Sequence, residues 1–187
     1  MSQPLIVVAL PEEAAHLHTN LPVLITGAGK VNAAIVVTRA LASAPVLPTE
    51  IINLGTAGAL RPGLSGTQQI GMVIQHDLDS PAIKALTGKD YGAPLRLADS
   101  GLTLATGDVF VADPVVQQTL ARQADLVDME GYAIAAAAAA FGVPIRMVKH
   151  VSDMADAEAM RSWTSTVDEC SRALAVWLAT SYFRRTG

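Results

Sequence analysis

Residues 126–153 read LVDMEGYAIAAAAAAFGVPIRMVKHVSD, and this stretch decides the fold class. A strand that is covered on both faces shows a short, continuous apolar run, as residues 5–10 (LIVVAL) do, and residues 126–129 and 145–151 are further strand candidates. Between them, residues 130–141 contain an alanine tract. Because alanine has the highest helix propensity and a very small side chain, the tract predicts a helix packed closely on a sheet.

The same alternation of strand and helix extends along the rest of the chain. Residues 80–100 are the most polar and irregular stretch, and they predict a loop with at most a short helix. The pattern predicts one domain, residues 1–187, built as a three-layer αβα sandwich around a central mixed, largely parallel twisted sheet. Further strands are predicted over residues 5–10, 23–26, 51–54, 70–74 and 102–106, and further helices over 31–42, from 113–114 onward and over 164–183.

The composition excludes several classes of protein. With 51% hydrophobic but only 4% aromatic residues, the chain can bury a large aliphatic core. A formal net charge of −4 argues against nucleic acid and anionic membrane surfaces as partners. The single cysteine, Cys170, excludes an internal disulfide framework. No apolar run reaches the roughly 18 residues of a membrane span, and no basic region precedes the first apolar stretch, so we expect a cytoplasmic globular protein.

Acidic residues follow three of the predicted strands. They are Glu12 and Glu13, the segment 128–130, and Asp153. Ligands of such sheets bind beyond the carboxyl ends of the strands, so these acids are candidates for a functional site. Helix capping is the alternative for Ser152 and Asp156 taken individually. Capping explains poorly why acids gather at the same end of three strands.

Two glycine loops, at residues 27–29 and 55–58, would let a ligand approach the backbone closely, although tight turns are the alternative. The first loop lacks the third glycine of a dinucleotide fingerprint, where Asn32 stands, and Val31 replaces the Ser or Thr of a phosphate-binding loop. The four histidines show no spacing that favours metal binding over solvated turns or core positions. We therefore expect neither a metal nor a cofactor.

Five segments, in this order, resemble the signatures of the purine nucleoside phosphorylase and nucleosidase superfamily, and most closely those of the 5′-methylthioadenosine/S-adenosylhomocysteine nucleosidases. The resemblance spans nearly the whole chain and implies that family's fold. It also implies hydrolysis of the N-glycosidic bond of an adenine nucleoside, with release of adenine and a 5′-substituted ribose. The segments are residues 9–13 (ALPEE), 26–34 (TGAGKVNAA), 51–58 (IINLGTAG), 127–131 (VDMEG) and 151–156 (VSDMAD).

The resemblance implies opposite tasks for two carboxylates. Asp153 matches the family's general acid, which protonates N7 of the departing adenine, and Ser152 would orient it. Glu13 matches the carboxylate that activates water. Glu130 matches the residue that holds the ribose hydroxyls, and Met129 the side chain that lies against the sugar. An acid and a base in one site require two different environments.

The remaining implied residues shape the substrate pocket. Phe110 and Val111 resemble the segment that stacks on the purine and reads its edge. Trp163 stands where the family places an aromatic ring over the 5′ substituent, although it could instead pack the start of the terminal helix. Leu10 and Thr26 complete the predicted substrate-binding residues. The expected partner is a small-molecule purine nucleoside, and the expected assembly is a homodimer.

Three other functions stay open at this point: phosphorolysis, hydrolysis of another purine nucleoside such as futalosine, and a non-catalytic nucleoside-binding module. A phosphorylase binds phosphate, normally through arginine. Asn53 occupies the region where phosphate-using relatives carry arginine, which favours hydrolysis, whereas Arg61 nearby leaves phosphorolysis open. A binding module would lack the acid or the base, and this sequence has both Glu13 and Asp153.

Overall fold

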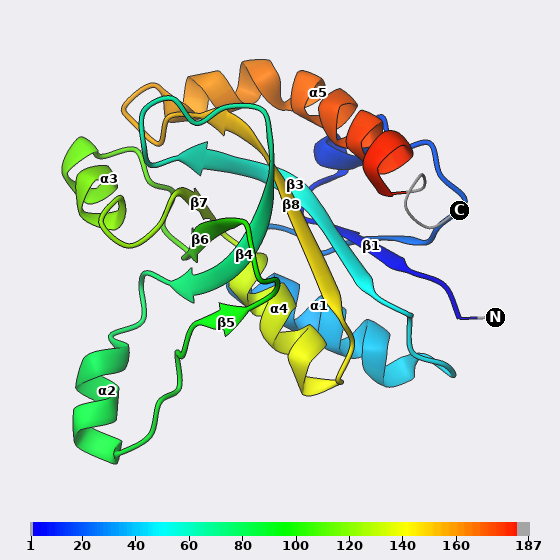
Figure 1. The fold of residues 1–187 in the computed structure, drawn as a ribbon, viewed down its shortest axis with the longest axis horizontal. Helices are drawn as coiled ribbons and strands as arrows, with labels where there is room; N and C mark the ends of the chain where they lie inside the picture. The colour runs from blue at the N-terminus through cyan, green and yellow to red at the C-terminus, as the bar shows by residue number, and fades with distance from the viewer. Residues whose placement is uncertain (1, 183–187) are drawn as a thin grey trace.

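The computed structural model describes residues 2–182, so Phe183, where the last predicted helix ends, lies outside the described residues. Within this range, eight strands form one sheet, and helices cover both of its faces (Figure 1). The strands are β1 (Leu5–Val8), β2 (Val23–Ile25), β3 (Ile51–Ala59), β4 (Thr67–Gln75), β5 (Leu95–Arg96), β6 (Leu102–Thr106), β7 (Leu126–Asp128) and β8 (Ile145–Asp153). The helices are η1 (Pro11–Ala14), α1 (Lys30–Ser43), α2 (Ser80–Thr87), α3 (Pro114–Leu120), α4 (Gly131–Ala140), α5 (Ala159–Trp177) and η2 (Leu178–Tyr182).

The sheet is mixed, as predicted. Its strand order is β2-β1-β3-β7-β6-β4-β5, and β8 pairs with both β3 and β4. Five of the strand pairings are parallel, and the pairings β3–β7, β4–β5 and β4–β8 are antiparallel. The pairings β3–β8–β4–β6–β7–β3 close a ring, so this part of the sheet curls on itself and strands distant in sequence meet at one end.

Two layers of helices bury the two faces of the sheet. In β1, the side chain of Val7 packs with α1 and α4, whereas its neighbours Ile6 and Val8 pack with α5 on the opposite face. Alternate side chains of a strand point to opposite faces, so a continuous apolar run is what a doubly covered strand requires. The three-layer αβα architecture predicted from the sequence is confirmed.

The alanine tract forms α4, which lies beside α1 on one face of the sheet (Figure 1). Ala135 and Ala138 are almost fully buried, and Ala138 packs against α1 and β1 in one apolar cluster. Small side chains let the helix approach the sheet closely. None of the helices within the described residues is both long and apolar enough to cross a membrane.

The glycine segment 55–58 differs from its prediction. It was expected to break the third strand, but β3 continues through it to Ala59. A Cβ on Gly55 would lie 3.2 Å from Oε1 of Glu13, and one on Gly58 would lie 2.8 Å from Oδ1 of Asp153. Because these glycines have no Cβ, two carboxylates can lie close to the strand while its backbone stays extended.

Two further boundaries differ from the sequence prediction. The last helix, α5, begins at Ala159, five residues before the predicted start. Within residues 80–100, the expected short helix is α2, capped by the side chain of Asp79, and the short strand β5 also forms there, paired with β4. A strand of two residues has too few positions to show a periodicity of its own.

Candidate active site

A cavity of about 260 Å³, here called the site cavity, lies where β1, β3, β7 and β8 end. Of the ten residues predicted for the site, nine line it: Leu10, Glu13, Phe110, Val111, Met129, Glu130, Ser152, Asp153 and Trp163. The tenth, Thr26, is not among the lining residues. Its hydroxyl donates to the carbonyl of Gly27, and its backbone N–H donates to the carbonyl of Val8. Thr26 thus completes the backbone hydrogen bonding beyond the ends of β1 and β2.

Glu13 is held by four hydrogen bonds. It lies in the helical turn η1 directly after β1 and is only 4% exposed. Its Oε2 accepts from the backbone N–H groups of Ala9 (3.1 Å) and Leu10 (3.2 Å). Its Oε1 accepts from both the backbone N–H (2.7 Å) and the hydroxyl (2.8 Å) of Thr56. The carboxylate is therefore fixed in position by donors from the residues that follow β1 and from β3.

Asp153 ends β8 and faces the same cavity. The hydroxyl of Ser152 donates to its Oδ2 at 2.7 Å, and the backbone N–H of Ala155 donates to its Oδ1 at 2.9 Å. Ala155 adopts a left-handed backbone with φ of 50°. A side chain in that conformation costs roughly 1–2 kcal/mol, so the turn that supplies this donor is strained. Both oxygens of Asp153 are thus oriented by neighbours in sequence.

The two carboxylates, Glu13 and Asp153, approach the cavity at different points. Glu13 lies against Gly55 and Asp153 against Gly58, both on β3. Three residues of extended strand span about 10 Å. A small molecule can therefore contact one carboxylate at each end of the cavity.

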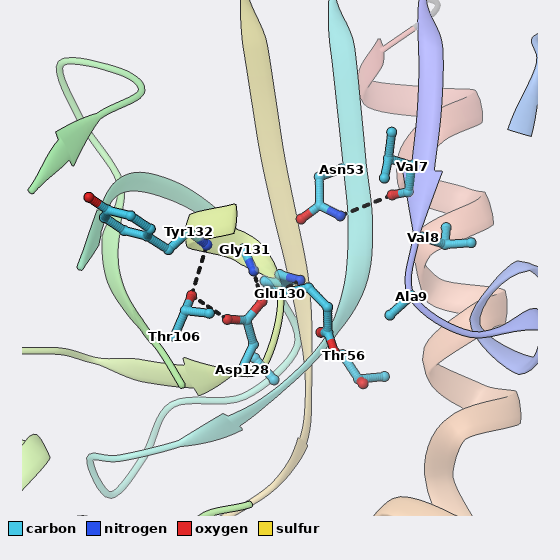
Figure 2. Close-up of polar contacts among 12 residues, drawn as sticks. Val7, Val8, Ala9, Asn53, Thr56, Thr106, Asp128, Glu130, Gly131 and Tyr132 are labelled. Carbon is cyan, nitrogen blue, oxygen red and sulfur yellow. Dashed lines mark hydrogen bonds and ion pairs between the residues drawn. The ribbon is translucent and has the colours of Figure 1, made fainter. Parts of the chain in front are cut away.

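Asp128 lines the site cavity and forms the centre of a buried polar network (Figure 2). It accepts from the hydroxyl of Thr106 (2.6 Å), from the backbone N–H of Gly131 (2.9 Å) and from Nζ of Lys149 (2.9 Å). The Thr106 hydroxyl in turn accepts from the backbone N–H of Tyr132. This network ties the ends of β6 and β7 and the middle of β8 to the first turn of α4.

Glu130 links the acidic cluster to the glycine loop. Its Oε1 accepts from the backbone N–H of Gly29 at 2.7 Å. Burial, followed by repulsion from Asp128, raises the pKa of Glu130 to about 7, against an ordinary value of 4.5. The side chain can therefore exchange a proton near neutral pH.

Lys149 is one of the residues that the sequence interpretation left out of its ten site residues, with Thr56 and Asp128, which line the cavity. It lies inside the predicted apolar strand and its side chain is only 3% exposed. Burial alone would lower the pKa of Lys149, but the negative charges of Asp128, Glu13 and Glu130 outweigh it and raise that pKa. The ammonium group therefore stays charged and balances the acidic cluster. A lysine in an apolar strand is rarely buried without an acidic partner, and that rule could have found it.

The segment that leads to Phe110 and Val111 is tied to the residues that follow the first glycine loop. The carboxylate of Asp108 accepts from the backbone N–H of Lys30 at 2.7 Å, at the first turn of α1. Asp77 pairs with Nζ of Lys30 and accepts from the backbone N–H of Asp108. These contacts fix the chain immediately before Phe110 and Val111.

Cationic side chains are absent from the cavity wall. Among residues 2–182, no arginine or lysine lines the site cavity. Arg61 pairs instead with Asp125 at 3.1 Å and donates to the carbonyl of Ala121, on the outside of the molecule. Asn53 is buried beneath the site, where its amide donates to the carbonyl of Val7 (Figure 2). The wall is suited to an uncharged ligand with hydroxyl groups more than to a free phosphate.

The chain is similar to known proteins over most of its length. The sequence model of the phosphorylase superfamily matches residues 16–180. A 5′-methylthioadenosine/S-adenosylhomocysteine nucleosidase from Bacillus subtilis (strain 168) is 31% identical over 182 residues, covering 82% of this chain and 76% of that protein.

Solved structures share the fold. An S-adenosylhomocysteine nucleosidase from Streptococcus pyogenes, in complex with 5-methylthiotubericidin, is 27% identical with a TM-score of 0.76, covering 95% of this chain and 94% of that one. The futalosine hydrolase of Helicobacter pylori strain 26695 has the same fold, with a TM-score of 0.84 at 20% identity over 95% of this chain and 96% of that one.

The match over residues 16–180 places this chain in the phosphorylase superfamily. Within that class, an identity of 31% to the Bacillus subtilis protein over most of both chains shows that it belongs to the 5′-methylthioadenosine/S-adenosylhomocysteine nucleosidase family. The family recognised from the five sequence segments is thereby confirmed.

Proposed function

We propose that this protein hydrolyses the N-glycosidic bond of adenine nucleosides with a 5′ thioether, of the 5′-methylthioadenosine and S-adenosylhomocysteine type, and releases adenine and a 5′-substituted ribose. One observation carries the proposal: two buried carboxylates line one cavity. Glu13 lies against Gly55 of β3, and Asp153 lies against Gly58 of the same strand. The nucleosidase names of the relatives support the same reaction.

In the proposed reaction, Asp153 in its acid form donates its proton to N7 of adenine while the bond between C1′ and N9 breaks. The electron pair of that bond leaves with the base. A water molecule forms the new bond to C1′, and its proton passes to Glu13. The two donors on Asp153 keep its oxygens aimed at the cavity, and the four donors on Glu13 fix the base. Such general acid–base groups typically contribute about 10²- to 10⁴-fold to the rate.

Glu130 and Met129 would hold the sugar between these two groups. Met129 and Glu130 line the same cavity as Glu13 and Asp153, and the backbone N–H of Gly29 already holds Glu130. A carboxylate can accept hydrogen bonds from both ribose hydroxyls. Phe110 and Val111 supply apolar surface to the same cavity, which suits a purine ring.

Water is the proposed nucleophile because no cationic side chain lines the described cavity wall. A phosphate dianion would need such a partner in a buried site. Hydrolysis of futalosine is the second candidate, supported only by the fold shared with the Helicobacter pylori enzyme.

The test is the release of free base from a panel of nucleosides, followed by chromatography with and without phosphate. The panel contains 5′-methylthioadenosine, S-adenosylhomocysteine, adenosine, inosine and futalosine. We expect adenine and a free reducing sugar from the two thioethers in phosphate-free buffer. A ribose 1-phosphate formed only with added phosphate would establish phosphorolysis, and turnover of futalosine alone would establish the second candidate. Binding of nucleoside without any turnover would identify a binding module.

We also propose that the protein acts as a homodimer. Four apolar side chains are exposed on the first turns of α1 and in the segment beside the cavity: Val31, Ile35, Val109 and Phe110. The bond between Lys30 and Asp108 brings these two segments together. Sedimentation velocity should give a dimer for the wild type and a monomer for Ile35→Glu with Val109→Glu, whereas a monomeric wild type would contradict the proposal.

A further inference from the structure

Trp163 makes a polar contact that its predicted role as an apolar wall does not require. It lies in the first part of α5 and lines the site cavity. Its indole N–H donates to the hydroxyl oxygen of Thr56 at 3.0 Å, and that hydroxyl donates to Oε1 of Glu13 at 2.8 Å. A side chain of the terminal helix is thus connected to the candidate base through one intervening hydroxyl.

The direction of these two hydrogen bonds follows from the chemistry of the groups. An indole N–H can only donate, and a threonine hydroxyl has one proton. Because the Thr56 oxygen accepts from Trp163, one of its acceptor positions is filled and its own proton is free for Glu13. A phenyl ring in the place of the indole would leave that acceptor position open to water and let the hydroxyl rotate.

The hydroxyl of Thr56 is also the adjustable donor on Glu13. The other three donors are backbone N–H groups, of Ala9, Leu10 and Thr56 itself, and these cannot rotate. A carboxylate has about four acceptor positions, and all four are filled here. For Glu13 to take a proton from water, one donor has to turn away, and the Thr56 hydroxyl is the one that can do so.

We propose that Trp163 is a positioning residue for Glu13 and acts on it through the Thr56 hydroxyl. This inference rests on the proposed function, in which Glu13 is the base. The indole N–H gives the hydroxyl a fixed partner both before and after it releases Glu13, since the Thr56 oxygen keeps a second acceptor position for the protonated carboxyl. Trp163 therefore affects the chemical step, beyond any apolar contact with substrate.

A double-mutant cycle tests the connection. Trp163→Phe keeps an aromatic ring of similar shape and removes the N–H, and Thr56→Val removes the hydroxyl at nearly constant volume. We expect Trp163→Phe to lower kcat for 5′-methylthioadenosine about 3- to 10-fold with little change in KM, the range expected from one lost hydrogen bond. In the Thr56→Val background, Trp163→Phe should not lower kcat any further. In the Thr56→Ser background, which keeps a hydroxyl, Trp163→Phe should lower kcat by the same factor as in the wild type.

The outcomes that overturn the proposal are equally definite. Trp163 acts directly on substrate if Trp163→Phe lowers kcat by the same factor with and without the Thr56 hydroxyl. It has no positioning role if the substitution changes only KM or nothing at all. Thermal unfolding midpoints of all variants show whether a lost rate reflects a lost fold.

A second measurement is independent of turnover. The chain has two tryptophans, so NMR resolves two indole N–H signals, and Trp163→Phe assigns them. Glu13→Gln should shift the Trp163 signal when Thr56 is present and leave it unshifted in Thr56→Val, with Trp177 as the internal control. An unshifted signal in both backgrounds contradicts the connection. A wild type that releases no adenine overturns the proposed function, while this NMR cycle still decides the connection between Trp163 and Glu13.

Discussion

Nζ of Lys149 lies 2.9 Å from Oδ2 of Asp128, and the two side chains are only 3% and 2% exposed. This ion pair lies beside the cavity, between β8 and the end of β7. Two further carboxylates, Glu13 and Glu130, lower the electrostatic energy of the same cation. One lysine therefore offsets the repulsion among three neighbouring carboxylates.

Lys149→Met should destabilise the protein by about 3–5 kcal/mol, because it leaves buried carboxylates without their cation. The free energy of unfolding from urea titration measures this loss. Lys84→Met is the matched control, since the Lys84–Asp90 pair is 3.5 Å apart with side chains 62% and 38% exposed. That substitution should stay within about 0.5 kcal/mol. Equal losses for the two variants would contradict the charge-balancing role of Lys149.

Asp153→Asn and Glu13→Gln should each lower kcat about 10²- to 10⁴-fold while nucleoside binding largely survives, because each removes a proton donor or acceptor and keeps the shape. Adenine release measures the rate, and calorimetric titration with a nucleoside measures binding. Glu12→Gln is the control for the base, since Glu12 is exposed and adjacent in sequence. Full activity in either of the first two variants would show that the chemistry lies on other residues.

The KM for 5′-methylthioadenosine should rise about tenfold per pH unit below pH 7. Burial and Asp128 raise the pKa of Glu130 to about 7, so the ionised carboxylate that we propose as the acceptor for the ribose hydroxyls is lost below that pH. In Glu130→Gln this dependence should disappear. The same raised pKa means that protonated Glu130 contributes to the free energy of unfolding below pH 4.5. This contribution is lost as the pH rises through 7, and Glu130→Gln should abolish that pH dependence of stability. A wild-type KM that stays flat from pH 5.5 to 8 would contradict the role of Glu130.

5′-Methylthioadenosine should have a kcat/KM roughly 5- to 150-fold above that of adenosine, because an apolar wall cannot satisfy the 5′ hydroxyl, whose unpaired burial costs on the order of 1–3 kcal/mol. Leu10, Met129 and Trp163 all line the cavity. Trp163→Ala should lower the ratio of kcat/KM for 5′-methylthioadenosine to kcat/KM for adenosine. Trp177→Ala, a packing change in the same helix, should lower stability and leave the ratio unchanged. A preference for adenosine would exclude the apolar pocket.

Gly58→Ala should lower kcat by up to about 10²-fold, since an added Cβ would lie 2.8 Å from Oδ1 of Asp153 and displace the candidate acid. The same Cβ would lie 3.1 Å from Cβ of Ala155 and 3.3 Å from Cγ1 of Val127, so the substitution should also lower the free energy of unfolding by about 1–3 kcal/mol, and turnover is compared under conditions where the variant is folded. Unchanged turnover in a folded Gly58→Ala protein would mean that Asp153 need not approach β3 so closely.

Local patterns in the sequence determined the layers of the fold. Continuous apolar runs mark strands covered on both faces, and the tract in residues 135–140 marks α4, because propensity and burial act over a few neighbouring residues. The same reasoning placed acids after β1, β7 and β8, and Asp153 and Ser152 meet because they are adjacent in the chain. The resemblance of five segments to the nucleosidase family implied ten site residues, and nine of them line one cavity.

Tertiary structure alone decided which of these groups contact one another. The pair of Lys149 with Asp128, and the bond from Trp163 to Thr56, which lie 107 residues apart, arise where the ring of strands closes and α5 crosses one face of the sheet. The continuation of β3 through its glycines was decided in the same way, by side chains from η1 and β8 that need the space of a missing Cβ. Periodicity reports which face of an element is buried, but it carries no information on the partner that arrives from a distant segment.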